Sequence, residues 1–256
     1  MSLKNKVIIV TGGTSGIGEG CSRHLAQLGG KVVVASIQRK EGKALEKAER
    51  SNVHDVHFVH TDVADEKSVQ ALISRTLKLH GRIDALVSNA GVLRMGPVTE
   101  FDEAMWDAVM GVNVKGNLWL AKHVAPVMKK QGKGVICITT SVAAFVGFPN
   151  HTLYCASKAA LEALVRSLAV ELAGYARVVG VCPGTIDTPM LAASCDGWAK
   201  PVAEIYAEVE QKIPVRRLGT PLDMARAIAF LLSDEASYID ATTLTIDGGT
   251  LALPPW

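Results

Sequence analysis

The segment TGGTSGIG at residues 11–18 constrains the fold of this chain more than any other feature. It follows the apolar run KVIIV (6–10) and leads into a segment with helical spacing at 17–28. Glycine within regular structure costs about 0.5–1 kcal/mol relative to alanine, so four glycines in eight residues indicate a backbone that must stay free of side chains. A strand, a glycine-rich turn and a helix together predict a phosphate site, because the helix N-terminus offers unpaired N–H groups. An ordinary tight turn is the alternative.

Three glycines of this turn have separate expected tasks. Gly12 would make the turn, Gly16 would let a diphosphate approach the backbone, and Gly18 would let the helix pack on its strand. The spacing T-G-x-x-x-G-x-G differs from the G-x-G-x-x-G form.

The rest of the chain alternates between strand-like and helix-like segments, which predicts βαβ units. The strand-like runs have little polar alternation, so the sheet should be covered on both faces and therefore parallel. The expected strands are 6–10, 31–36, 55–61, 83–88, 134–140, 177–182 and 243–247. The helical segments include 17–28, 65–79, 104–130, 153–173 and 221–232. The pattern predicts an α/β fold, a doubly wound parallel sheet of about seven strands with helices on both faces.

We expect one domain over residues 1–256, because no linker, repeat or low-complexity segment divides the chain. Residues 187–215 follow a strand but carry no further strand-like run. Ligands in open α/β sheets bind outside the carboxyl ends of the strands, so this segment is expected to be a loop insertion over a substrate. A surface helix pair is the alternative.

Composition excludes several classes of function. The chain of 256 residues is 48% apolar and 20% charged, a composition that supplies a large core. Its net charge is only +2, and nothing in the sequence suggests the clustered basic face that nucleic-acid binding needs. No apolar run reaches the roughly 18 residues of a membrane span, and the N-terminus lacks the apolar region of a signal peptide. We therefore expect a cytoplasmic protein without membrane partners. The five cysteines are odd in number and form no CxxC pair, so we expect reduced thiols and no metal site.

Several motifs occur in the order found in the short-chain dehydrogenase/reductase family, and the chain resembles that family over essentially its whole length. The matching pieces are TGGTSGIG (11–18), TDVAD (61–65), SNAGV (88–92), NVKGN (113–117), YCASK (154–158), CPGTIDTPM (182–190) and TIDGG (245–249). Ser141 precedes Tyr154 by 13 residues, as the family's catalytic serine does. The resemblance implies a Rossmann-like domain and an NAD(P)-dependent oxidoreductase.

Tyr154 and Lys158 are four residues apart in a helical segment, so they share one helix face. A free tyrosine has a pKa near 10, and a neighbouring ammonium favours the phenolate and lowers that pKa. Tyr154 could then exchange a proton with an alcohol or a ketone as a general acid/base. Ser141 would orient the substrate oxygen, and the resemblance implies that Asn113 holds a relay water beside Lys158. The nicotinamide would supply the hydride.

The resemblance also implies the cofactor-binding residues. They are Gly12, Thr14, Ser15, Gly16, Ile17, Gly18, Ser36, Arg39, Asp62, Val63, Asn89, Ala90, Gly91, Tyr154, Lys158, Pro183, Gly184, Ile186 and Thr188. Asp62 should accept from the adenine amino group, and Thr188 should contact the carboxamide together with the backbone of Ile186.

The end of the second strand favours NADP(H) over NAD(H). NAD enzymes usually place an acid there for the ribose 2′-hydroxyl, whereas this chain has Ser36. Arg39 and Lys40 lie just beyond and could attract a 2′-phosphate. The arginine expected at Ile37, or a basic residue at Ser15, is missing, so NAD(H) stays open. An ordinary solvated helix start is the alternative for Arg39 and Lys40.

The expected substrate pocket is mostly apolar. Its candidate walls are Leu93, Met95, Val142, Ala143, Phe148, His151, Met190, Leu191 and Trp198. We expect a ketone or secondary alcohol of medium size, such as an aryl ketone, keto ester, steroid or terpenoid. His151 either bonds a polar substituent or simply starts a helix.

Other functions remain open. A β-ketoacyl carrier-protein reductase could dock its partner on MKKQGK (128–133), but those enzymes usually carry an arginine where this chain has Val170. A non-catalytic dinucleotide sensor or scaffold would have no chemical reason to keep Asn113, Ser141, Tyr154 and Lys158. An epimerase or dehydratase of the family is usually longer.

The resemblance further implies a homotetramer, or a dimer, with 104–130 and 153–173 at a four-helix interface. The apolar tail 251–256 should pack on a neighbouring subunit or on its own domain.

Overall fold

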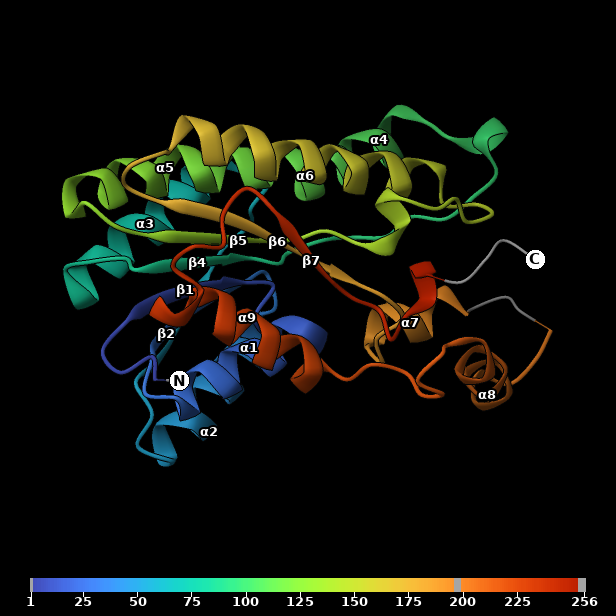
Figure 1. The fold of residues 1–256 in the computed structure, drawn as a ribbon, viewed down its shortest axis with the longest axis horizontal. Helices are drawn as coiled ribbons and strands as arrows, with labels where there is room; N and C mark the ends of the chain where they lie inside the picture. Colours follow the sequence, from blue (N-terminus) through green and yellow to red (C-terminus); the bar gives the residue numbers. More distant parts are fainter. Residues whose placement is uncertain (1, 196–198, 253–256) are drawn as a thin grey trace.

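A seven-stranded parallel sheet forms the centre of the computed structural model, which describes residues 2–195 and 199–252 (Figure 1). The strand order is β3-β2-β1-β4-β5-β6-β7, which reverses direction between β1 and β4. Such a reversal opens a crevice at the carboxyl ends of the strands. The strands are β1 (Val7–Thr11), β2 (Lys31–Ser36), β3 (Val56–His60), β4 (Ala85–Ser88), β5 (Val135–Thr139), β6 (Arg177–Pro183) and β7 (Thr243–Ile246).

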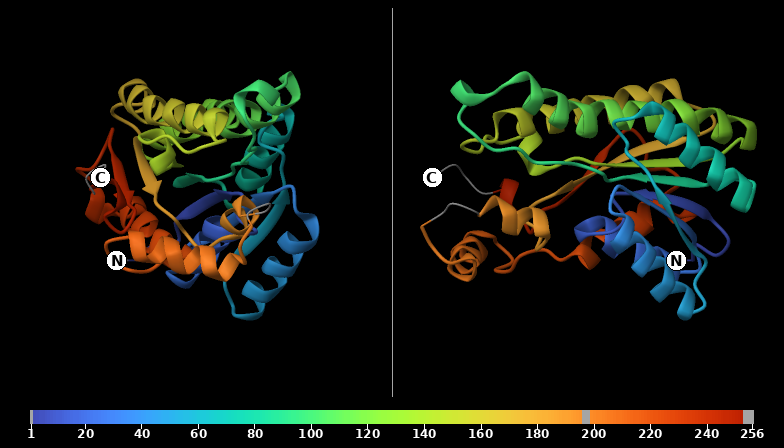
Figure 2. Two further views of the ribbon diagram at one scale, coloured as in Figure 1. Left: turned by 90° about the vertical axis from the view of Figure 1, so that its right-hand side faces the viewer. Right: turned by 180° about the vertical axis from the view of Figure 1, so that it is seen from behind.

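Helices cover both faces of the sheet, so the doubly wound α/β prediction is confirmed (Figure 2). One face carries α1 (Gly16–Gln27), α2 (Arg39–Ser51) and α9 (Pro221–Leu232). The other carries α3 (Glu66–His80), α4 (Glu103–Met110), α5 (Gly116–Gln131) and α6 (Thr152–Glu171). The strands bury both of their faces, which explains why they show little polar alternation in the sequence.

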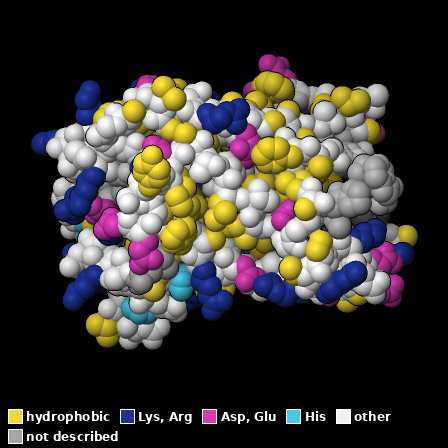
Figure 3. All heavy atoms as spheres, viewed as in Figure 1, with side chains coloured by type: hydrophobic (Ala, Val, Ile, Leu, Met, Phe, Trp, Pro, Cys, Tyr) yellow, Lys and Arg dark blue, Asp and Glu magenta, His cyan; other side chains and the backbone are white. Residues whose placement is uncertain are grey.

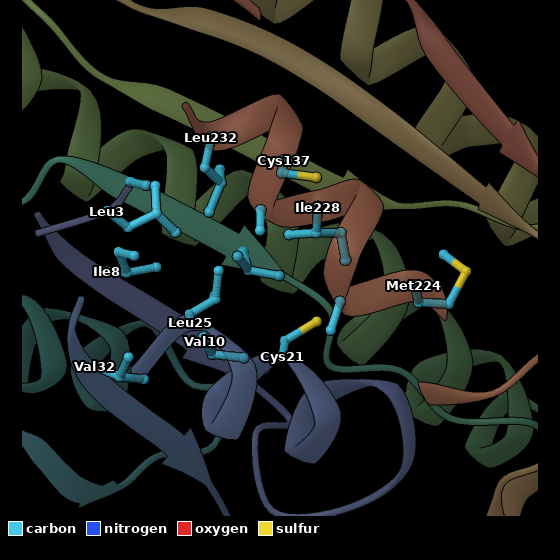
Figure 4. Packing of buried hydrophobic residues seen from close by; sticks show 14 of the residues in the cluster. Leu3, Ile8, Val10, Cys21, Leu25, Val32, Cys137, Met224, Ile228 and Leu232 are labelled. Atoms are coloured by element: carbon cyan, nitrogen blue, oxygen red, sulfur yellow. The ribbon is translucent and has the colours of Figure 1, made fainter. Parts of the chain in front are cut away.

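Two hydrophobic clusters hold these layers together. The first lies between the sheet and α1, α2 and α9, where Cys21 and Leu25 meet Met224 and Ile228 (Figure 4). The second lies beneath α3, α5 and α6 and contains Leu72, Leu120 and Leu161, among others. All five cysteines are free thiols, and four of them are buried, as expected for small apolar core residues.

The segment expected at 104–130 as one helix is divided by a π-helical turn. The turn covers Gly111–Lys115 and joins α4 to α5. π-turns insert one extra residue and redirect side chains, and sequence periodicity does not reveal them. This turn contains Asn113, so it sets the direction of that side chain.

The segment 187–215 holds two helices beyond the carboxyl ends of the strands (Figure 1). They are α7 (Pro189–Ser194) and α8 (Val202–Lys212). Short 3₁₀ turns cover Val98–Glu100, Val142–Ala144, Asp234–Ala236 and Thr250–Ala252. Within the described residues, no helix is both long enough and apolar enough to span a bilayer.

Candidate active site

A cavity of about 420 Å³ opens at the carboxyl ends of the strands. Its walls come from the glycine turn, the ends of β4, β5 and β6, the start of α6, and the α7–α8 segment. Its lining residues are Gly12, Ser15, Gly16, Ile17, Asn89, Ala90, Gly91, Leu93, Thr139, Thr140, Ser141, Val142, Ala143, Phe148, His151, Tyr154, Lys158, Pro183, Gly184, Thr185, Ile186, Thr188, Pro189, Met190, Leu191, Ser194 and Val209. The structure therefore brings most of the expected site residues to one place.

The glycine turn has the shape that a diphosphate requires. Gly12 adopts a left-handed conformation with φ of +63°, and a Cβ there would press on the Ala90 backbone. A Cβ at Gly18 would overlap the carbonyl oxygen of Gly12, so α1 can approach β1 only with glycine at this position. Ser15 starts α1 without a side-chain hydrogen bond to the helix, which leaves the N–H groups of the first turn available. These residues fit a dinucleotide.

Thr188 lies over this turn. Its side chain is 3.2 Å from the position of a Cβ on Gly16, and its hydroxyl accepts from Leu191 N–H at 3.3 Å as the cap of α7. Pro183, Gly184 and Ile186, which precede it, also line the cavity. The α7 segment is thereby joined to the turn that would hold the cofactor.

The end of β2 is neutral. The buried Ser36 hydroxyl is hydrogen-bonded to Thr14 Oγ1 at 2.8 Å and accepts from Gln38 N–H at 3.1 Å. Arg39 and Lys40 begin α2, are exposed, and have no ion pair among the described residues. A 2′-phosphate at this place would meet two cations and no carboxylate from β2.

The adenine side of the expected site lies after β3. Asp62 is exposed, and its Oδ1 accepts from Ala64 N–H at 2.9 Å, which leaves the second carboxylate oxygen available. Val63 is buried against Gly116 of α5. Neither residue lines the cavity, so their adenine-side role stays a prediction.

Tyr154, Ser141 and Lys158 meet at the inner end of the cavity. The hydroxyls of Tyr154 and Ser141 are hydrogen-bonded. Ser141 Oγ also accepts from Ala143 N–H at 3.1 Å, which fixes the serine side chain at the start of a 3₁₀ turn. Lys158 Nζ lies 5.6 Å from the centre of the Tyr154 ring. A carbonyl oxygen placed beside both hydroxyls would receive two hydrogen bonds.

Burial has the largest effect on the pKa values of Tyr154 and Lys158. It raises the pKa of Tyr154 to about 12, and the hydrogen bond with Ser141 acts in the opposite direction. Burial lowers the pKa of Lys158 to about 8. The sequence led us to expect acidification of Tyr154 by Lys158, and that effect stays a prediction. A phenol that is protonated at neutral pH is ready to give a proton to a ketone.

Asn113 supports the floor of the cavity. Its side chain accepts from Val92 N–H at 2.8 Å, and its amide donates to Val92 O and to Ser157 Oγ, both at 3.0 Å. Asn117 donates to the main-chain oxygen of Asn113 at 2.7 Å. Because the Asn113 amide is fully engaged by protein, it holds the 89–92 loop against α6, and its role in a water relay stays a prediction.

The expected substrate walls are mostly in place. Leu93, Val142, Ala143, Phe148, His151, Met190 and Leu191 line the cavity. Met95 is half-buried but does not line it. Trp198 lies outside the described residues.

Several lining residues were not expected from the sequence, among them Ser194 of α7 and Val209 of α8. The helical spacing of Ile205 and Val209 in 202–212 was the signal that could have indicated an inward face. His151 starts α6, and Pro149 O lies 2.6 Å from its Nδ1, so this nitrogen carries the proton.

Comparison with known proteins assigns the family. A family model described as enoyl-(acyl carrier protein) reductase matches residues 12–250. Dehydrogenase/reductase SDR family member 4 of Sus scrofa is 37% identical over 250 residues, covering 97% of this chain and 88% of the relative. This chain belongs to the short-chain dehydrogenase/reductase family. An uncharacterized oxidoreductase of Thermotoga maritima is 38% identical over 254 residues, covering 99% of this chain and 100% of the relative.

Solved structures of oxidoreductases share the fold of this chain. A crystal structure of levodione reductase has a TM-score of 0.93 and 33% identity, covering 98% of this chain and 100% of that one. A single-residue variant of actinorhodin polyketide ketoreductase, solved with NADPH, has a TM-score of 0.92 and 28% identity, covering 98% of this chain and 99% of that one. The family is one of nicotinamide-dependent oxidoreductases, so this short-chain dehydrogenase/reductase is an enzyme acting on CH–OH and C=O groups.

Proposed function

We propose that this short-chain dehydrogenase/reductase reduces medium-sized apolar ketones, or oxidises the matching secondary alcohols. The observation that supports it most is the meeting of Tyr154, Ser141 and Lys158 in one cavity beside the glycine turn. When bound, the nicotinamide dinucleotide supplies or accepts the hydride.

In the reducing direction, the Tyr154 phenol donates its proton to the carbonyl oxygen. Ser141 donates a second hydrogen bond to the same oxygen and so orients it for attack. Lys158 stays close to Tyr154 and would bind the ribose. Its positive charge stabilises the phenolate that remains after proton transfer.

NADP(H) is the proposed cofactor. The neutral Ser36 at the end of β2 and the exposed Arg39 and Lys40 support it. Arginine and lysine are well suited to a phosphate dianion, whereas a carboxylate would repel it. NAD(H) is the alternative.

The walls support an apolar substrate. Val142, Leu191 and Val209 line the cavity together with Phe148 and Met190. Tyr154, Ser141 and Lys158 bring polar groups to the reacting centre, the pattern of a site that positions one oxygen and selects by apolar shape around it.

A panel of ketones and alcohols with both cofactors tests the proposal. Wild type should oxidise NADPH with apolar ketones, and Tyr154→Phe should lose at least roughly 100-fold in kcat. Tyr238→Phe, at a fully exposed tyrosine, is the matched control and should leave the rate unchanged. Activity confined to highly charged sugars, or a Tyr154→Phe rate within about tenfold of wild type, would overturn the proposal.

A second candidate is reduction of a carrier-protein thioester, which the description of the matching family model favours. Val170, at the position where ketoacyl reductases usually carry arginine, is 77% exposed and would offer no charge to an acidic partner. Comparing a β-ketoacyl carrier protein with the free ketone separates the two functions. A dinucleotide-binding scaffold is excluded by any ketone-dependent oxidation of NAD(P)H.

We also propose a homotetramer, with a dimer as the alternative. Trp106 of α4, Leu118 of α5 and Val170 of α6 are all exposed apolar residues on one side of the sheet. Figure 3 shows further hydrophobic side chains over the middle of the face where β7 lies. Leu244 of β7 is also exposed. Exposed apolar surface of this kind favours subunit contacts. Light scattering on the purified chain measures the mass, and a monomer would contradict the proposal. The expected packing of the tail concerns 251–256, of which 253–256 lie outside the described residues.

A further inference from the structure

Three potential metal ligands meet at the edge of the sheet, at the opposite end of the strands from the cavity. Asp55 directly precedes the edge strand β3, His57 lies within it, and His80 is the last residue of α3. One ligand atom from each of the three lies within 4.8 Å of the other two. We propose that Asp55, His57 and His80 bind a divalent transition metal ion such as Zn²⁺.

The contacts within this group match a metal site. His57 Nε2 lies 3.1 Å from Asp55 Oδ1, and the two imidazole rings have centroids 5.5 Å apart with a tilt of 59°. Zinc bonds of about 2.0–2.2 Å in a tetrahedral arrangement place ligand atoms roughly 3–4 Å apart, so the group needs only small side-chain shifts.

His80 provides a second, independent observation. Its Nε2 is buried and has no hydrogen-bond partner among the described residues. Buried polar atoms are almost always paired, and an orphan imidazole nitrogen therefore calls for a partner that protein atoms do not supply. A metal ion ligated by His80 Nε2 would account for the orphan.

A fourth ligand is within reach. Water could supply it, since Glu46 of α2 lies on the other side of the His57 ring, with its Oε1 3.6 Å from Nδ1, whereas Asp55 faces Nε2. Lys31 is the positive charge that faces His80. Glu46 faces Arg50, whose Nη1 lies 4.0 Å from Oε1, so Asp55 is the carboxylate that offsets Lys31 beside the two imidazoles.

Two imidazoles and a carboxylate are ligands typical of zinc, cobalt or nickel rather than of magnesium or calcium. Because Asp55 stands at the amino end of β3, the ion would not touch the cavity. It would instead join the edge strand to α3. Its expected effect is therefore on stability and not on turnover.

Zn²⁺ titration of the chelator-treated full chain, followed by calorimetry, tests the proposal. Wild type should bind one equivalent at micromolar or lower concentration, and its Tm should rise with added zinc. His80→Ala and His57→Gln should each weaken binding by roughly 100-fold or more, since each removes a direct ligand. Co²⁺ in place of Zn²⁺ should give the visible bands of a four-coordinate site in wild type alone.

Two control variants separate this site from other zinc ligands. His123→Gln removes a histidine whose Nε2 lies 2.9 Å from Glu66 but which has no third ligand in the described structure. Cys155→Ser removes the one half-buried thiol among the five. Both should bind zinc as wild type does, and ketone reduction should change less than about twofold in every variant. Failure of wild type to bind at roughly 100-fold excess of zinc, or unchanged affinity in both ligand variants, would overturn the proposal.

Discussion

Lys158 Nζ donates a hydrogen bond of 2.9 Å to the main-chain oxygen of Thr139, so the lysine of α6 is fastened to the end of β5. The lysine is only 4% exposed. Its Nζ also lies 3.8 Å from where a Cβ of Gly91 would stand, an ordinary van der Waals distance. The ammonium is thus held near the Tyr154 ring by a main-chain acceptor at the end of β5.

Lys158 should make stability depend on pH. Its pKa falls from 10.5 to about 8 on folding, so between these values the unfolded chain binds more protons than the native one. Stability therefore rises with pH across that window, by up to the order of 3 kcal/mol. Lys158→Met removes this rise and should also reduce kcat at least roughly 100-fold. Urea unfolding between about pH 7 and pH 10 measures the first effect.

The comparison with Lys158→Met isolates the lysine. The buried Cys182 has a pKa raised to about 11, which acts in the opposite direction at high pH, but both proteins share it. Lys122→Met, at an exposed lysine paired with Glu66, should leave the profile unchanged. Parallel pH profiles for wild type and Lys158→Met would contradict the prediction.

Gly18→Ala should abolish cofactor binding and destabilise the fold. The added Cβ would overlap the Gly12 carbonyl, and the rigid backbone on both sides can relieve the clash only by moving α1 off β1. Overpacking of this kind costs about 1–3 kcal/mol or more. Thermal unfolding and NADPH fluorescence titration measure the two effects.

Gly111→Ala is the matched control. Gly111 has helical dihedrals, and the nearest atom to its added Cβ is 3.8 Å away. Alanine should be neutral there or stabilise by up to about 1 kcal/mol. Equal Tm values for the two variants would show that the close approach of Gly18 is not needed.

Ser36→Asp should shift cofactor preference toward NAD(H). A carboxylate at the end of β2 would repel the 2′-phosphate and accept hydrogen bonds from a free ribose. We expect the ratio of kcat/KM for NADPH over NADH to fall at least roughly tenfold, which corresponds to about 1.4 kcal/mol. Ser51→Asp, an exposed serine at the far end of α2, should leave the ratio unchanged. A wild type that already prefers NADH would refute the underlying assignment.

The sheet could be predicted because strands buried on both faces produce unbroken apolar runs. Every expected strand matched an observed one to within about two residues at each end. The division of 104–130 into two helices could not be predicted, because the residues on each side of the π-turn keep helical periodicity.

Some features of the candidate site could likewise be predicted from the sequence, and others could not. Tyr154 and Lys158 share a helix face and could be paired from spacing, and the glycine turn follows from its backbone demands. The hydrogen bonds of the Asn113 side chain with Val92 and Ser157 could not be predicted, because they join three segments that meet only in the folded chain. The spacing of Ile205 and Val209 indicates one inward face of α8, but the cavity that this face covers depends on how α8 packs beyond the strand ends.

Asp223 should stabilise α9 at neutral pH and lose this effect in acid. Thr220 and Asp223 form a reciprocal capping box, and Arg217 lies 2.7 Å from the Asp223 carboxylate. Hydrogen bonding to Arg217 lowers the pKa of Asp223 from 3.8 to about 2, so its contribution is complete above pH 3.8 and fades as pH falls toward 2.

Asp223→Asn should therefore lower the free energy of unfolding by about 1 kcal/mol at pH 7 and by almost nothing near pH 2. The value at pH 7 is kept small because the Arg217 partner is exposed to solvent, which weakens the ion pair. Asp234→Asn is the contrast, because Asp234 also pairs with a cation, Lys6, but its side chain is 95% exposed. That variant should change stability by less than about 0.5 kcal/mol at any pH. The effect of Asp223 matters for the cofactor site, because α9 packs against α1 in the cluster that holds the glycine turn on the sheet. Equal costs for the two variants at pH 7 would show that solvent exposure does not set the strength of these ion pairs here.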